Sequence, residues 1–145
     1  MRFLLCVAGG FALAGLYNSQ ASATPAQDCK KPVYLTFDTG HMAVAPVIAD
    51  ILARQKVVVT FFAANEKTKE GDGSLGEHWG GWWRERAKEG HEFASHTFNH
   101  VYWVADAGKD AFRVKPSAGS RQGETYILDR NGYCEELSQS SRRLQ

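Results

Sequence analysis

The chain has 145 residues, a length that allows one domain at most. Its composition, 43% hydrophobic and 23% charged, is ordinary for a globular protein and excludes disordered, collagen-like and coiled-coil chains. The formal net charge is only +1 and no basic run with interleaved aromatic residues is present. We therefore expect no nucleic-acid partner.

The first 23 residues have the three parts of a secretory signal peptide. Arg2 gives a positive start, residues 3–16 are apolar, and the small residues 21–23 fit the cleavage rule. The alternative is a membrane anchor, but the apolar run is short for a membrane span and is followed by residues 17–20, which are largely polar. We expect cleavage after Ala23, a secreted or periplasmic protein, and no stable membrane anchor.

Export changes how the remaining cysteines are interpreted. Cys29 and Cys134 stay in the chain after the predicted cleavage. Two cysteines in an oxidising compartment can form a disulfide. A bond between the two and a pair of unpaired thiols are both open at this point.

Residues 24–32 form a short polar linker, and the predicted domain begins at residue 33. Residues 33–37 predict a first strand because they are mostly β-branched or aromatic and are followed by Asp, Thr and Gly. Apolar side chains then recur at helical spacing and predict one face of an amphipathic helix, formed by Val44, Val47, Ile48, Ile51 and Leu52. Pro46 fits such a helix only near its first turn.

The next segments repeat the alternation of strand and helix. Residues 57–62 predict a second strand, apolar at successive positions as in a strand covered on both faces. Residues 65–76 predict a flexible loop, because they lack the Lys-Ser/Thr ending of a phosphate-binding loop. Residues 77–89 predict a helix that stops at Gly90, and residues 91–95 predict a third strand.

The order strand, helix, strand, helix, strand predicts a parallel sheet with crossover helices. Three tryptophans share one face of the second helix and are expected in the core rather than on a sugar-binding platform: Trp79, Trp82 and Trp83. The pattern weakens beyond residue 104. Residues 125–128 are a candidate strand, Asn131 and Gly132 predict a turn, and residues 138–145 read as a frayed polar end.

Three polar residues follow predicted strands. Asp38 ends the first strand, and His96 and His100 follow the third. Sites assemble at the carboxyl ends of parallel strands, and a His-x-x-x-His pair on a helical turn shares one face. Imidazoles are good ligands for zinc, and a nearby carboxylate can deprotonate a metal-bound water. Alone, the histidine pair is more often a surface pair and the aspartate a turn former; their joint placement indicates a hydrolytic metal site.

Two segments resemble motifs of the polysaccharide deacetylases, carbohydrate esterase family 4 with its NodB-homology domain. Residues 36–40 (TFDTG) resemble the first motif and residues 96–100 (HTFNH) the second, and residues 59–65 and 90–96 also resemble that family. The resemblance implies a (β/α) barrel, a divalent metal, usually zinc, and hydrolysis of N-acetyl groups on a polysaccharide substrate. It implies Asp38 as the catalytic base and His96 and His100 as metal ligands.

The sequence departs from that family at one ligand. Thr39 stands where the family usually has a second aspartate, the third metal ligand. Three alternatives follow. Two histidines bind the metal weakly together with waters, Asp38 turns toward the metal, or His41 substitutes for the missing ligand; for His41, a role in packing or exposure to solvent is slightly favoured.

The family's later motifs are also missing. No histidine follows His100, so the late Leu-x-His motif with its general acid is absent, and residues 112–116 only faintly resemble the third motif. We expect an α/β fold in which residues 33–145 are the N-terminal portion of a deacetylase domain, an incomplete barrel. An active enzyme and a truncated, inactive one are both open, as is a non-catalytic, carbohydrate-binding remnant whose candidate sugar contacts are Trp82, Trp83, Tyr102 and Trp103.

Overall fold

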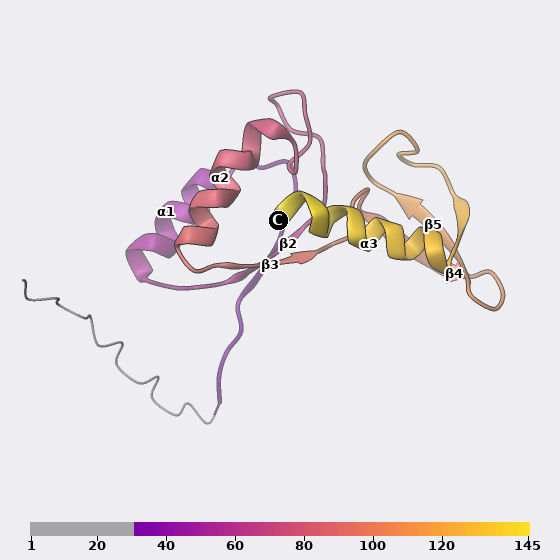
Figure 1. Cartoon of the computed structure of the whole chain (residues 1–145), viewed down its shortest axis with the longest axis horizontal. Helices are drawn as coiled ribbons and strands as arrows, with labels where there is room; N and C mark the ends of the chain where they lie inside the picture. The colour runs from indigo at the N-terminus through magenta and orange to yellow at the C-terminus, as the bar shows by residue number, and fades with distance from the viewer. Residues whose placement is uncertain (1–30) are drawn as a thin grey trace, which may run out of the picture. The chain divides into compact units, whose positions relative to one another are not determined.

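A three-stranded parallel sheet forms the first part of the computed structural model, which describes residues 31–145. The strands β1 (Thr36–Asp38), β2 (Thr60–Ala63) and β3 (Glu92–Ser95) lie side by side in that order. Their register places Phe61 opposite Phe37 on one side and opposite Phe93 on the other. The parallel sheet predicted from the alternation of strands and helices is therefore confirmed (Figure 1).

The first two strands begin later than predicted. Val33 and Tyr34 precede β1 and are 94% and 84% exposed, and Val57 and Val58 precede β2. Pairing between β1 and β2 starts only where Thr36 lies opposite Thr60. The residues before that point have high strand propensity but no partner in the sheet, and propensity without cross-strand contacts does not form a strand.

Helix α1 (Ala45–Gln55) begins with a proline in its first turn, as predicted. Its buried side chains are Ala45, Ala49 and Leu52, whereas three residues of the predicted apolar face are 44–62% exposed: Val44, Val47 and Ile51. The prediction was wrong for these three residues, but Leu52 is buried and Ile48 packs against the core as predicted. The sequence has two neighbouring apolar rows, and the row that contains the alanines is buried.

Helix α2 (Glu77–Lys88) ends just before Gly90, whose φ of +91° suits a residue without a side chain. Trp79 and Trp83 of this helix are buried. The Phe61 ring of β2 lies edge-on to Trp83, with ring centroids 5.8 Å apart. These contacts confirm that the helix turns its tryptophans toward the core.

The second part of the chain is an antiparallel sheet and a helix. Strands β4 (Val101–Asp106), β5 (Ala111–Pro116) and β6 (Tyr126–Asp129) lie in chain order, and helix α3 (Arg130–Leu144) follows. Only β6 was predicted. Helix α3 contacts both β6 and β3, so it joins the two sheets (Figure 1).

Two predictions for the C-terminal segment were wrong. Residues 131 and 132, predicted as a turn, lie in the first turn of α3, and residues 138–144, predicted as frayed, are helical. Asp129 caps this helix by accepting a hydrogen bond from the Gly132 backbone N–H at 2.7 Å. The buried residues of α3 are Glu136 and Ser140, so the helix has no buried apolar row for sequence periodicity to reveal.

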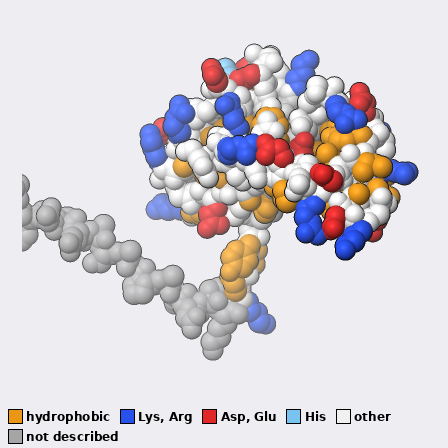
Figure 2. All heavy atoms as spheres, turned by 45° about the vertical axis from the view of Figure 1, so that its right-hand side comes forward, with side chains coloured by type: hydrophobic (Ala, Val, Ile, Leu, Met, Phe, Trp, Pro, Cys, Tyr) orange, Lys and Arg blue, Asp and Glu red, His pale blue; other side chains and the backbone are white. Residues whose placement is uncertain are grey.

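Several predictions lie outside the described residues. They are the signal peptide over residues 1–23, nearly all of the linker, and Cys29, so the open question of a disulfide with the exposed Cys134 is not decided. Within residues 31–145, no helix is long and apolar enough to cross a membrane. Figure 2 shows acidic and basic side chains interspersed over the visible face, in keeping with the small net charge.

Candidate functional site

The structure brings Asp38 and His96 together at the carboxyl end of the parallel sheet. Asp38 is the last residue of β1, and His96 directly follows β3 on the other side of β2. The Asp38 Oδ2 and His96 Nε2 atoms are 3.6 Å apart. Their side chains are 64% and 36% exposed, so water and a solute can reach both.

His100 lies beside His96. The two ring centroids are 4.8 Å apart with the planes inclined by 41°. The segment that joins them is not the helical turn considered from the sequence, because Thr97 and His100 both have left-handed backbones, with φ of +62° and +50°. Such conformations are costly for residues with a side chain and persist where surrounding contacts hold them.

Those contacts come largely from helix α3. The Glu136 carboxylate accepts hydrogen bonds from the backbone N–H of Asn99 at 2.8 Å and from its side-chain amide at 2.7 Å. The Glu136 carbonyl accepts a further bond from the Phe98 N–H at 2.8 Å. Within the turn, the Thr97 hydroxyl oxygen accepts from the Val101 N–H at 2.6 Å. A buried glutamate of the second part of the chain thus fixes the turn between the two histidines.

A second buried carboxylate fixes the His100 ring. Glu66 is 7% exposed, and its Oε1 accepts hydrogen bonds from His100 Nδ1 and, at 2.5 Å, from the Ser117 hydroxyl. An ionised carboxylate can only accept, so the proton of a neutral His100 lies on Nδ1. The Nε2 lone pair of His100 is then available to a ligand.

Sequence reasoning missed Glu66 and Ser117. Glu66 lies three residues after the end of β2, and the rule that selected Asp38 and the histidines, a polar residue soon after a predicted strand, would also have found it. Ser117 follows β5, a strand that the sequence does not predict, and it carried no comparable signal.

Thr39 and His41 both make hydrogen bonds with the segment that follows β2. The Thr39 hydroxyl accepts from the Ala64 N–H at 2.9 Å and donates to the Ala64 carbonyl at 3.3 Å, so it ties the end of β1 to the end of β2. His41 Nδ1 donates to the Lys67 carbonyl at 2.8 Å, a bond that leaves the Nε2 lone pair of the ring free. The three alternatives for completing the metal site, two histidines with waters, Asp38 or His41, therefore stay open.

The described residues do not fit a zinc site with three protein ligands. Catalytic zinc sites usually have three such ligands. Within residues 31–145, no group of three or more His, Cys, Asp or Glu side chains is arranged to hold a metal ion. The arrangement provides two adjacent imidazoles and a carboxylate that faces one of them.

Two cavities border these residues. A polar cleft of about 890 Å³ is lined by Glu66, Lys67, His100 and Tyr102, among others. An apolar cavity of about 290 Å³ begins at Asp38 and extends between α1 and the tryptophans of α2. Gly40 and His41 line both cavities. His100 lines the polar cleft and Asp38 lines the apolar cavity, whereas His96 lines neither.

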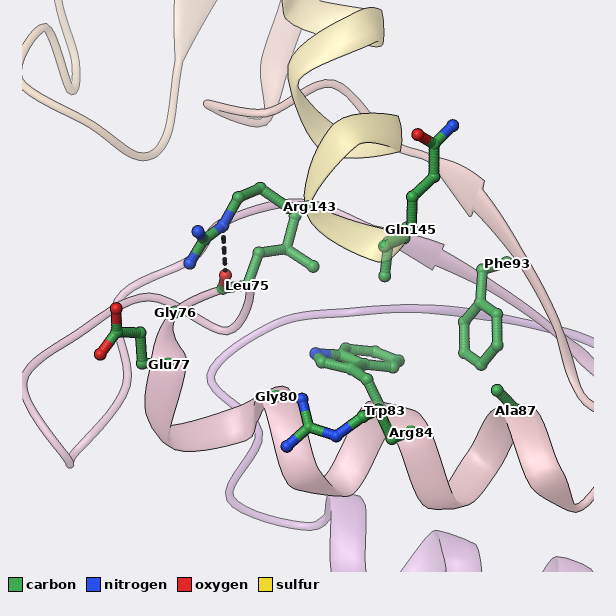
Figure 3. Close-up of a pocket in the computed structure, with 11 residues that line it drawn as sticks. Leu75, Gly76, Glu77, Gly80, Trp83, Arg84, Ala87, Phe93, Arg143 and Gln145 are labelled. Carbon is green, nitrogen blue, oxygen red and sulfur yellow. Dashed lines mark hydrogen bonds between the residues drawn. The ribbon is translucent and has the colours of Figure 1, made fainter.

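A third cavity, of about 520 Å³, lies elsewhere, between α2 and the end of α3 (Figure 3). Trp83, Arg84 and Phe93 line it, and the Arg143 side chain reaches across to donate to the Leu75 carbonyl at 3.1 Å. None of Asp38, His96 and His100 lines this cavity, so it is separate from the candidate site.

Comparisons with known proteins point to one family. A family model described as polysaccharide deacetylase matches residues 26–140. The chain is also 36% identical, over 82 residues, to a chitooligosaccharide deacetylase of Sinorhizobium fredii (strain NBRC 101917 / NGR234); the match covers 56% of this chain and 34% of that protein. The chain thus spans about a third of the length of this relative. No solved structure shows a significant match to the chain.

Proposed function

The chain belongs to the polysaccharide deacetylase family, and from this premise we propose that it provides the Asp38, His96 and His100 part of a site that removes N-acetyl groups from a polysaccharide. The observation that carries the proposal is the approach of Asp38 Oδ2 to His96 Nε2, 3.6 Å apart at the carboxyl end of the parallel sheet. The name of the chitooligosaccharide deacetylase relative supports an N-acetylated sugar as the substrate.

The proposed reaction is hydrolysis of an acetamide. The oxygen of water adds to the acetyl carbonyl carbon and the water loses a proton. The bond from that carbon to nitrogen breaks as the nitrogen takes up this proton, and acetate and a free sugar amine leave. Asp38 is the proposed base that takes a proton from the attacking water at Oδ2. Its side chain is 64% exposed, which lets water and the acetamide approach the carboxylate together.

Zinc is the ion proposed for His96 and His100. The support is the type of residue and the 4.8 Å between the two ring centroids, since imidazole is a common zinc ligand. Two imidazoles without a third protein ligand hold zinc weakly, and tighter binding would require Asp38 or His41 to turn toward the ion. Metal analysis of the purified protein, with and without added zinc, measures that occupancy.

Acetate release from N-acetylglucosamine oligomers tests the proposed activity. We expect Asp38→Asn to lower the rate by about 100-fold or more, because general-base catalysis contributes at least that factor. Asp50→Asn is the matched control: Asp50 is 61% exposed on α1, pairs with Arg54 at 2.7 Å and lies outside the site. No release by the unaltered chain, or equal rates for the two variants, would contradict the proposal.

A non-catalytic, carbohydrate-binding remnant of the same fold is the alternative. Two observations favour this alternative. The Thr39 hydroxyl is hydrogen-bonded to the Ala64 backbone, and the described residues include no group of three or more side chains that could hold a metal ion. The alternative predicts that the chain binds N-acetylglucosamine oligomers without releasing acetate. Stoichiometric zinc in the purified protein, bound with a sub-micromolar dissociation constant, would count against it.

Two further features belong to this proposal. The domain is an incomplete barrel. In support, the parallel sheet formed by the described residues has three strands and does not close, so β1 and β3 lie at its two edges. The protein is exported to the periplasm or the medium, which is supported by the signal-peptide pattern of residues 1–23. A mature N-terminus at Thr24, read by mass spectrometry after expression of the whole chain, checks the export proposal.

A further inference from the structure

Tyr102 lies at the boundary between two clefts next to the candidate site. It is the second residue of β4, and 54% of its surface is exposed. Its ring centroid is 4.9 Å from that of His100, with the planes inclined by 38°. Tyr102 lines the 890 Å³ cleft that contains His100 and also a second cleft of about 370 Å³, which Lys115 and Gly123 line. A chain-like ligand that leaves His100 in this direction must pass the Tyr102 ring.

The other aromatic residues considered as sugar contacts do not share this position. Trp83 is buried, and both Trp82 and Trp83 lie edge-on to Phe61, with ring centroids 5.7 Å and 5.8 Å away. Trp103 packs on Phe112, whose ring centroid is 4.6 Å away. Because successive side chains of a strand point to opposite faces, Trp103 faces away from the side on which Tyr102 meets His100.

The surroundings of Tyr102 suit a sugar. A pyranose ring presents polarised C–H bonds on its faces, and these are attracted to the negatively charged face of an aromatic ring. Its hydroxyl groups project from the rim and need polar partners. Gln122 lines both clefts beside Tyr102, and Lys115 lines the smaller one. An exposed aromatic ring with polar side chains nearby is the usual composition of a site that orients a polar ligand.

We propose that Tyr102 forms a binding subsite for the sugar residue adjacent to the one whose acetamide lies at Asp38 and His96. Gln122 and Lys115 are the hydrogen-bonding partners of that neighbouring sugar. The inference rests on the proposed function for the identity of the ligand, an N-acetylated polysaccharide. It adds the place at which the neighbouring sugar is held, the Tyr102 ring beyond His100.

Binding of N-acetylglucosamine and of its oligomers with two to five sugars, measured by calorimetric titration of the full chain, tests the subsite. We expect Tyr102→Ala to weaken binding of the longer oligomers by about tenfold and to leave monosaccharide binding unchanged, and Tyr102→Phe to restore oligomer binding because the ring remains. Trp103→Ala is the matched control, since Trp103 is the next residue of β4, is 53% exposed and lies on the opposite face.

The outcomes separate the subsite from the proposed hydrolysis. Length-dependent binding that is lost in Tyr102→Ala supports the subsite even when no acetate is released. Acetate release with equal oligomer binding in Tyr102→Ala and Trp103→Ala overturns the subsite and leaves the proposed function standing. The absence of any oligomer binding, or an equal loss in Tyr102→Phe and Tyr102→Ala, also overturns it. Unchanged urea midpoints in all three variants show that each still folds.

Discussion

Residues 33–100 and residues 101–145 contribute to the candidate site in different ways. The first region is a parallel sheet with two helices, and it carries Asp38, His96 and His100. The second region is an antiparallel sheet with one helix, and it carries Glu136, which fixes the turn between the two histidines. The comparison teaches that the groups proposed to act all belong to the first region, whereas the groups that hold them come from both: Glu66 from the first and Glu136 from the second.

The helices α2 and α3 of the two regions also bury different kinds of side chain. In the first, aromatic side chains such as Phe61 and Trp83 pack between the sheet and α2. In the second, α3 buries a glutamate and a serine. The buried Glu136 carboxylate accepts hydrogen bonds from the backbone N–H and the side-chain amide of Asn99. Apolar packing is tolerant of exchange between similar residues, whereas a buried charged hydrogen bond is costly to leave half made. Single substitutions should therefore distinguish the two regions.

The largest effect is expected from Glu136→Ala. The change removes both carboxylate bonds to Asn99 and leaves two half-buried donors without that partner, which should lower the free energy of unfolding by about 3 kcal/mol. Urea denaturation measures the loss, and the amide NMR signals of residues 96–100 should broaden or shift.

Glu135→Ala is the matched control for this change. Glu135 is the preceding residue of α3, its side chain is 59% exposed, and it pairs with Arg142 on the surface. Its removal should cost less than about 1 kcal/mol. Equal losses for Glu135→Ala and Glu136→Ala would show that α3 does not hold the histidine turn.

A smaller effect is expected from Glu66→Ala, about 2 kcal/mol. The carboxylate is buried, but Ser117 Oγ lies 2.8 Å from His100 Nδ1 and can replace part of the lost interaction. Because a hydroxyl can donate as well as accept, the His100 ring should then populate both neutral tautomers. The ¹⁵N chemical shifts of the ring measure the two tautomer populations. Unchanged shifts would contradict the positioning role of Glu66. Glu70→Ala, which changes an exposed residue of the same loop, is the control.

The smallest effect is expected from Gly119→Ala measured against Gly123→Ala. Both glycines have left-handed backbones, with φ of +77° and +81°. A Cβ on Gly119 would lie 2.1 Å from Asn99 Oδ1, whereas a Cβ on Gly123 meets nothing within 4 Å. Gly119→Ala should therefore cost about 1 kcal/mol more than Gly123→Ala in urea denaturation. An equal cost would show that the Asn99 side chain moves freely and that its bond to Glu136 is weak.

Much of the first region was predictable because its signals are local. The alternation of apolar strands with amphipathic helices predicted the parallel sheet, and the strand-end rule placed Asp38 near the histidines. The same signals predicted only part of the buried face of α1, since two apolar rows compete there and only packing against the core chooses between them. They also started β1 and β2 too early, because strand pairing depends on residues distant in sequence.

The second region was largely unpredictable for a related reason. Five of the six residues of β4 are exposed, and α3 buries Glu136 and Ser140, so neither element shows an apolar period. By itself, the sequence determined the order of the first elements, the candidate residues Asp38, His96 and His100, and the resemblance to a deacetylase. Only the tertiary structure decided that Thr39 bonds Ala64, that Glu66 orients His100, and that Glu136 holds the turn. These contacts join residues 25 to 37 positions apart, and a pattern that repeats over a few residues cannot encode such pairings.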